Sequence, residues 1–209
     1  MDWPTIASLG TAIGTLVLAI ATFVSVLSGR RAARIAERAL LAGTQPILAP
    51  SRTQDPETKI GFQEGHFVRA PGGGGVVEVT EGVVYMAISV RNVGPGLAVL
   101  HSWSASPLDL ISPSDHADPK TFHRLTRDLY VPVGDIGFWQ GALRDPTTQE
   151  FATMAGAAGE KQRICVDILY GDHEGGQRVI TRFLLTPHDD QWLATVARYW
   201  NLDRAQPRQ

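Results

Sequence analysis

The most pronounced feature of the hydropathy pattern is an uncharged stretch of 22 residues, from position 6 to position 27. At about 1.5 Å per residue, a helix over this stretch is about 33 Å long, enough to cross the ~30 Å hydrocarbon core of a bilayer. A secretory signal has a basic start and an apolar run of about 7 to 15 residues. This chain starts Met-Asp-Trp-Pro, so we interpret the stretch as a permanent anchor with Trp3 at the interface. A cleaved leader with unusual flanks and an exported domain is the alternative.

Charge gives the anchor an expected orientation. Basic residues stay on the cytoplasmic side, so we predict a single-pass plasma-membrane protein with its N-terminus outside and its C-terminal domain cytoplasmic. The basic residues that follow the span can contact anionic lipid headgroups, or serve only as a topology signal. We expect the helix to continue to Gly43. The basic residues after the span are Arg30, Arg31, Arg34 and Arg38.

Gly10 and Gly14 form a Gly-x-x-x-Gly pattern inside the predicted span. Such a pattern lets two helix backbones approach closely, which suggests a homo-oligomer formed through the membrane helix. Small residues are also common in membrane helices, and an incidental occurrence is the alternative.

Beyond the helix, apolar and polar positions alternate in short runs separated by turn residues, which is typical of β-strands. We predict that Asn92-Val-Gly-Pro-Gly96 joins the first two runs as a hairpin, with Val99, His101 and Trp103 on one side of its second strand. A second hairpin turns at residues 171–176. The predicted strands cover residues 83–91, 97–106, 129–133, 136–143, 163–170 and 177–185.

Helical segments are predicted in three places after the anchor. Residues 120–127 fit a short helix, and residues 147–154 fit one or two turns before a flexible AGAAGE sequence. Asp189 or Asp190 can cap a C-terminal helix. Its apolar positions recur at roughly helical spacing: Trp192, Val196, Tyr199 and Trp200.

Together these elements predict a mainly β protein. The expected architecture is an N-terminal transmembrane helix followed by an antiparallel, Ig-like β-sandwich with a short C-terminal helix. The expected division is an anchor with a basic extension at residues 1–43, the β-sandwich domain at 44–203 and a polar tail at 204–209.

Composition narrows the function classes. Without Asp2, Glu37 and the four arginines after the span, 15 basic and 19 acidic residues remain. A mildly acidic domain argues against nucleic acid as a partner, because phosphate binding needs a positive field. The single cysteine, Cys165, cannot form an internal disulfide and fits a buried position in a reducing compartment.

Candidate chemistry is sparse. Asp172, His173 and His188 are weak metal-ligand candidates in two polar loops, but neither zinc spacing nor an EF-hand pattern is present, and a polar turn explains both loops. Consecutive Ser114-Asp115-His116 cannot form a catalytic triad. The glycines at residues 72–75 lack the Lys-Ser/Thr of a phosphate-binding loop and indicate a flexible turn. We therefore predict no enzyme activity and no cofactor.

The aromatic residues offer a candidate interaction surface. Phe138 and Trp139 lie on opposite faces of a short strand, and Arg144 follows it. Exposed Trp and Arg side chains anchor many protein interfaces, so these three residues are our candidate recognition patch. Packing in the core is the alternative for the aromatic pair.

Several segments carry a resemblance that covers most of the chain. The uncharged span followed by arginines, QPILAP, SVRNVGPGLAVLHSW, VGDIGFWQGALRD and DILYGDHEGGQRVITRF resemble uncharacterised bacterial, actinobacterial-type, single-pass membrane-anchored proteins with a β-sandwich domain. The resemblance implies the architecture. It implies no activity and transfers no functional residues.

These features favour a membrane-anchored protein whose cytoplasmic β-sandwich binds a protein partner. The alternative is a membrane-tethered sensor of a small molecule or metal ion, using the loops at residues 171–176 and 187–190. An enzyme whose residues converge only in three dimensions, or a purely structural homo-oligomer, are further alternatives.

Overall fold

The computed structural model describes residues 2–203, without the side chains of residues 3–7 and 9. Contacts divide the chain into two compact units, Met1–Gly43 and Thr44–Gln209, and each is described by itself. The predicted tail at 204–209 and the side chain of Trp3 lie outside the described part.

The first unit is one helix, α1 (Trp3–Gly43). Within it, Gly10–Gly43 is the one stretch of the described residues that is long and apolar enough to cross a membrane. The hydroxyl groups of Thr15 and Thr22 donate to the carbonyl oxygens of Thr11 and Leu18, at 2.9 and 2.8 Å. These polar groups are thereby satisfied inside the helix, as a hydrocarbon environment requires. The predicted continuation of the helix to Gly43 is confirmed.

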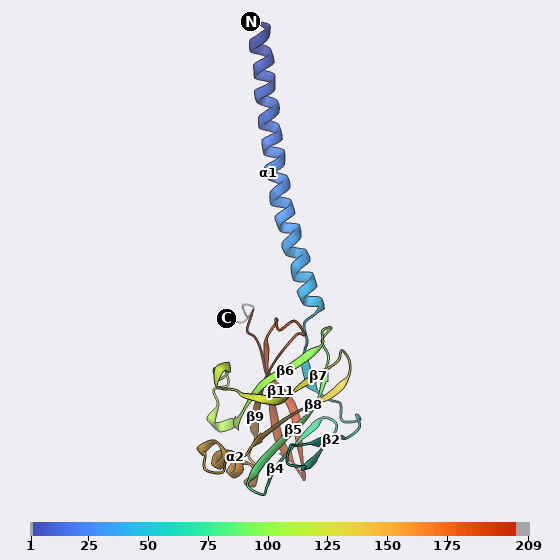
Figure 1. Cartoon of the computed structure of the whole chain (residues 1–209), viewed down its shortest axis with the longest axis vertical. Helices are drawn as coiled ribbons and strands as arrows, with labels where there is room; N and C mark the ends of the chain where they lie inside the picture. The colour runs from blue at the N-terminus through green and yellow to red at the C-terminus, as the bar shows by residue number, and fades with distance from the viewer. Residues whose placement is uncertain (1, 204–209) are drawn as a thin grey trace. The chain divides into compact units, whose positions relative to one another are not determined.

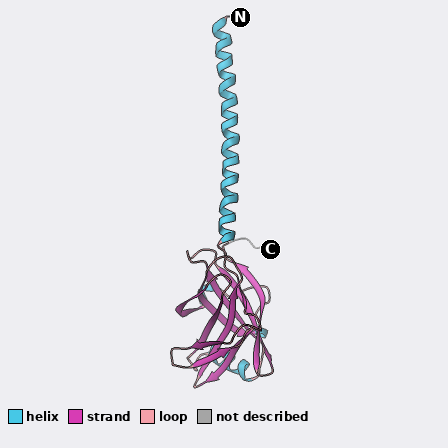
Figure 2. Ribbon diagram, turned by 90° about the vertical axis from the view of Figure 1, so that its right-hand side faces the viewer, coloured by secondary structure: helices cyan, strands magenta, loops and turns pink. Residues whose placement is uncertain are grey.

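The second unit consists mainly of strands (Figure 2). Its helical segments are η1 (Leu108–Leu110), η2 (Pro119–Thr121) and α2 (Gln149–Gly159). Its strands are β1 (Leu48–Pro50), β2 (Thr58–Gly61), β3 (Phe67–Ala70), β4 (Gly74–Thr80), β5 (Val83–Asn92), β6 (Ala98–Pro107), β7 (His123–Val131), β8 (Ile136–Leu143), β9 (Ile164–Gly171), β10 (Val179–His188) and β11 (Gln191–Asn201).

The strands form a curled antiparallel sheet in the order β8-β5-β4-β11-β10-β9-β6-β7, with β1 also paired to β5 (Figure 1). β4 and β11 are joined over a short stretch, through the pairs Trp192–Gly75 and Leu193–Gly74 and through the hydrogen bond from Ala194 N to Gly73 O at 3.0 Å. Two of the glycines predicted to form a flexible turn are therefore strand residues at this junction. The mainly β class is confirmed, whereas the Ig-like sandwich is not.

The core fills the interior of the curled sheet. Its largest fully buried side chains include Trp139, Tyr170, Phe183, Met86 and Ile168. The separate β2–β3 hairpin covers part of the outer face of β5 and β8. There Ile60, Phe62 and Val68 pack with Tyr85 and Ala87, and Phe138 packs against this second cluster. β8 is thus covered on both faces.

The predicted C-terminal helix is wrong, because residues 191–201 form β11. Asp189 and Asp190 are the two residues of a tight turn between the paired His188 and Gln191, and Asp189 has a φ of 53°. A register shift in the β10–β11 ladder, between Arg182 and Phe183, then interrupts the alternation of β11. This bulge made the aromatic spacing resemble a helix.

The predicted hairpin between residues 83–91 and 97–106 is also wrong. Both strands exist, but β5 pairs with β1, β4 and β8, while β6 pairs with β7 and β9. The buried Asn92 redirects the chain, since its Nδ2 donates to Gly96 O at 2.6 Å and to Val131 O at 2.9 Å. A register shift between Leu100 and Ser102 breaks the predicted alternation, so Trp103 is buried while His101 is exposed.

The remaining segments are partly as predicted. The β9–β10 hairpin and the strand at residues 136–143 are confirmed. The short helix expected at 120–127 is replaced by η2 and the start of β7. The expected helical turns around residue 150 extend further as α2, whose Thr148 hydroxyl accepts a hydrogen bond from Phe151 N, and α2 includes most of the AGAAGE sequence.

Candidate functional site

The two ends of the curled sheet, β7 and β8, are consecutive in the chain but form no ladder with each other among the described residues. We call the gap between them the seam. A sheet that ends in unpaired strand edges carries free N–H and C=O groups, which are a template for another chain. The seam is therefore a candidate binding site for an extended chain.

The β8 edge has a defined set of backbone groups that no other strand pairs with among the described residues. Asn92 N donates to Asp135 O at 3.1 Å, which continues the β5–β8 ladder, and Ser89 O accepts from Ser51 N on the opposite side of β5. Because bonded and non-bonded pairs alternate in an antiparallel ladder, Phe138 opposite Ser89 belongs to the non-bonded set. The N–H and C=O groups of Phe138, Gln140 and Ala142 consequently point toward the seam, where Ala142 O accepts a hydrogen bond from Arg144 Nη1 at 3.5 Å.

The β7 edge is bulged. Leu100 pairs with Leu129 and Ser102 pairs with Arg124, so the single residue His101 lies opposite residues 125–128. These four residues stand away from the β6 ladder. The β7–β8 turn follows at residues 132–135, where Asp135 N donates to Pro132 O at 3.2 Å.

The two strands diverge from that turn. Near it, Val131 lies so close to Gly137 that a Cβ at position 137 would come within 2.7 Å of the Val131 side chain. At the far end the seam opens into a cleft of about 140 Å³. A Cβ at position 141 would lie 2.8 Å from the rings of Trp103 and Trp139, so glycine there leaves room for the Trp103 indole at the cleft. The lining residues also include Phe62, His123, Arg124, Gln140 and Arg144.

Side chains span the seam where the backbone does not. Arg127 on β7 donates from Nη2 to Gln140 Oε1 on β8 at 2.6 Å, and its guanidinium carbon lies 5.4 Å from the Phe138 ring centroid. At the rim, Arg144 forms an ion pair with Glu64, and hydrogen bonding from Arg144 lowers the pKa of Glu64 below its ordinary value. His123 Nε2 lies 2.8 Å from Glu150 Oε1, and its ring lies 4.7 Å from Trp103.

The cleft carries positive side chains that are not paired with a negative charge. Arg144 and His123 each face a carboxylate. In contrast, Arg127 pairs with a neutral amide, and the exposed side chain of Arg124 has no partner among the described residues. Two arginines on β7 thus lack a compensating negative charge, although the domain as a whole is mildly acidic.

The structure separates the three residues of the predicted recognition patch. Trp139 is fully buried and belongs to the interior core, whereas Phe138 is half-buried under Arg127. Arg144 is exposed at the cleft rim. Sequence reasoning missed Phe62, Trp103, Arg124 and Arg127, because these come from other segments of the chain. Gly137 and Gly141, on either side of Phe138–Gln140, were the sequence feature that could have indicated this site.

The weak metal candidates do not converge. Asp172 is buried, and its Oδ1 accepts from Glu174 N and Gly176 N at 3.1 and 2.8 Å, which ties the carboxylate to its own loop. That loop and the His188 turn lie at opposite ends of β10, about 30 Å apart along the strand. Among the described residues, no group of three or more His, Cys, Asp or Glu is placed to hold a metal ion.

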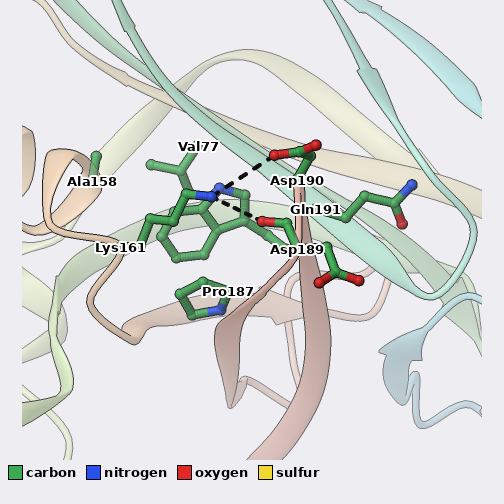
Figure 3. A pocket seen from close by; sticks show the side chains of 8 residues that line it. Val77, Ala158, Lys161, Pro187, Asp189, Asp190 and Gln191 are labelled. Carbon is green, nitrogen blue, oxygen red and sulfur yellow. Dashed lines mark hydrogen bonds and ion pairs between the residues drawn. The ribbon is translucent and has the colours of Figure 1, made fainter.

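The turn after His188 borders a pocket of about 220 Å³ (Figure 3). Lys161 donates from Nζ to Asp189 O at 2.9 Å and lies 3.9 Å from Asp190 Oδ1. Figure 3 shows the lysine aimed at this turn, with Pro187 and Val77 nearby. These contacts attach the end of α2 to the β10–β11 turn, which is a structural role.

The other nucleophile candidates are also accounted for by structure. Cys165 is fully buried, and burial raises the pKa of its thiol to about 11. In the 114–116 segment, Ser114 lies beside Asp115 while His116 Nδ1 is directed to Ala117 O. This segment lies over a buried ion pair between Arg182 and Asp167, and Arg182 also donates to Ser112 O and Asp115 O.

The candidate membrane residues all lie on α1. Gly10 and Gly14 are four residues apart and therefore share one helix face, and a Cβ on either would meet nothing within 4 Å. Arg34 Nε donates to Arg30 O at 3.3 Å, and the exposed basic group also contains Arg31 and Arg38.

Comparisons with models of protein families, with curated proteins and with solved structures find no match to this chain. Its function is therefore inferred from its own geometry.

Proposed function

We propose that this protein is a single-pass membrane protein whose cytoplasmic β domain binds a protein partner at the seam between β7 and β8. The observation that carries the proposal is the β8 edge, where backbone groups at Phe138, Gln140 and Ala142 face the seam. Gln140 and Ala142 also line the cleft, together with the aromatic residues Phe62 and Trp103. Strand addition at an open sheet edge is a common mode of peptide recognition.

Pocket size supports a protein partner over a small molecule. Four surface pockets of the β domain have volumes of about 140, 220, 260 and 270 Å³. Small-molecule sites usually occupy about 300 to 1,000 Å³. A cleft of this size suits one anchoring side chain of a partner, with the partner backbone lying along the strand edge.

The anchor part of the proposal rests on α1. Its length and apolar composition fit a bilayer span, and the arginines at its C-terminal part favour a cytoplasmic location for the β domain. Protease added outside intact cells should leave the β domain uncut, and should cut it once the membrane is permeabilised. Cleavage in intact cells would show the opposite orientation.

The face with Gly10 and Gly14 supports a second proposal, a homodimer formed by two copies of α1. A Gly14→Ile variant should abolish a chemically crosslinked dimer in detergent. The exposed Gly29, outside this pair, offers Gly29→Ala as a matched control. An unchanged dimer in Gly14→Ile would contradict the homodimer.

Co-purification in mild detergent tests the docking function. Three forms are compared: the full-length chain, residues 1–43 alone, and a full-length Ala142→Pro variant. Proline removes an N–H that faces the seam while sparing the bonds to β5, so the fold should persist and the partner should be lost. A partner retained by residues 1–43 alone would assign binding to the helix. A partner retained by a folded Ala142→Pro variant would move the docking site away from the seam.

A further inference from the structure

We propose that the segment bound at the seam is an extended acidic peptide, which adds to β8 as a new edge strand and places carboxylates against Arg124 and Arg127. This inference rests on the proposed docking function and specifies the chemistry of the partner.

The extended conformation follows from the spacing of the backbone groups on β8 that face the seam. Phe138, Gln140 and Ala142 recur every second residue, which is the repeat at which an antiparallel neighbour exchanges pairs of hydrogen bonds. A helix cannot match this repeat, because its own N–H and C=O groups are bonded internally. A strand also directs alternate side chains to one face, so one of them can enter the cleft beside Trp103 and Phe62.

The acidic character of the ligand follows from the fact that neither Arg124 nor Arg127 has a carboxylate partner among the described residues. Arg127 now donates to the neutral oxygen of Gln140 at 2.6 Å, and Arg124 has no partner among the described residues. Hydrogen bonds from arginine to a carboxylate are roughly twice as strong as bonds between neutral groups. An acidic ligand therefore lets Arg127 exchange a weaker acceptor for a stronger one. When Arg127 turns from Gln140 to the ligand, its side chain no longer bridges β7 and β8, and the seam is open to the peptide.

The neighbouring ionic groups do not cancel this preference. Glu64 and Glu150 do not line the cleft themselves, and each already pairs with a residue that does, Arg144 and His123 respectively. Asp128, also on β7, lies 3.4 Å from the Tyr130 hydroxyl. Asp128 has no ion-pair partner among the described residues, so Arg124 and Arg127 leave one excess positive charge on β7, which would repel a basic peptide.

Selection from a displayed library of short random peptides tests the inference. The target is the full-length protein in phospholipid nanodiscs, and empty nanodiscs remove lipid-binding sequences. Selected peptides are then measured against wild type, Arg124→Glu, Ala142→Pro and Arg163→Glu. Arg163 is an exposed arginine just before β9, so Arg163→Glu makes the same charge change away from the seam.

We expect the selected peptides to be enriched in Asp and Glu and to lose affinity about tenfold or more with Arg124→Glu, because a charge-assisted bond is replaced by repulsion. Affinity should be unchanged with Arg163→Glu and should fall with added salt. Peptides without acidic enrichment that still fail to bind Ala142→Pro would overturn the acidic class and leave the docking function standing. A selection that yields no seam-dependent peptide would overturn both.

Discussion

Arg127 and Gln140 form a direct side-chain hydrogen bond between β7 and β8, with Arg127 Nη2 2.6 Å from Gln140 Oε1. The two strands follow one another in the chain and share a tight turn, yet no ladder joins them in the part of the chain that the structure describes. A side-chain bond thus occupies the place of backbone pairing. Because a side chain can swing aside more readily than a ladder can open, this arrangement is suited to admitting a third strand.

Hydrogen exchange along β8 should alternate. Amides at Trp139, Gly141 and Leu143 face β5 and should exchange slowly, while those at Phe138, Gln140 and Ala142 face the seam and should exchange faster. Residue-resolved exchange by NMR measures both sets in one sample. Uniform slow exchange along the strand would show that the seam edge is already paired.

Replacing Arg127 with alanine should loosen the seam. A hydrogen bond from a charged donor contributes about 1.5 to 3 kcal/mol when buried, and less here because Arg127 is exposed. We expect a loss of about 1 kcal/mol in unfolding free energy and faster exchange at residues 123–128. The matched control is Arg124→Ala, which removes an arginine of the same strand without a described partner. Equal effects of the two substitutions would mean that the bond to Gln140 does not hold the seam.

The ion pair between Arg182 and Asp167 should be the most sensitive polar contact in the β domain. Both side chains are at most 5% exposed, with Arg182 Nε 2.7 Å from Asp167 Oδ1. Arg182→Met should cost about 3 to 5 kcal/mol, because it leaves a buried carboxylate unpaired. The double variant Asp167→Leu/Arg182→Met should recover much of that loss. Denaturant titration checks both values, and a double variant less stable than Arg182→Met would contradict this interpretation.

Cys165 should behave as an inert core residue. Its thiol pKa is raised from 9.0 to about 11 by burial, so the native thiol remains protonated at pH values where an unfolded one ionises. Since the unfolded state then releases a proton that the native state keeps, stability contributed by Cys165 should fall as pH rises above about 9. A thiol reagent at pH 8 should label the protein only as fast as it unfolds. Rapid labelling of folded protein would show an accessible thiolate.

The elements that the sequence predicted correctly are those whose pattern is local. The α1 helix follows from an unbroken apolar run, and the β9–β10 hairpin follows from two alternating strands around a polar turn. β11 was misassigned because the bulge opposite Arg182 shifts its apolar positions out of a two-residue repeat. The prediction of a β5–β6 hairpin was wrong because the buried Asn92 directs the chain to a different neighbour. No local pattern encodes that choice.

The candidate site was predictable only in part. Arg144 and Phe138 could be recognised as an arginine and an aromatic beside glycines, and the structure places both at or near the cleft. Arg124 and Arg127 could not, because their segment was expected to be helical and its bulge depends on pairing with β6. The cleft exists only once distant strands have closed into a curled sheet.

Site-specific photo-crosslinking in living cells tests the central claim most directly. A photoreactive amino acid is placed at Thr126, which lines the cleft on β7, at Ala142 on β8, or at the distant exposed Arg163. We predict the same discrete adduct from Thr126 and Ala142, none from Arg163, and loss of the Thr126 adduct when Arg124→Glu is added. Adducts of equal yield from Arg163, or none from the two seam positions, would contradict a docking site between β7 and β8.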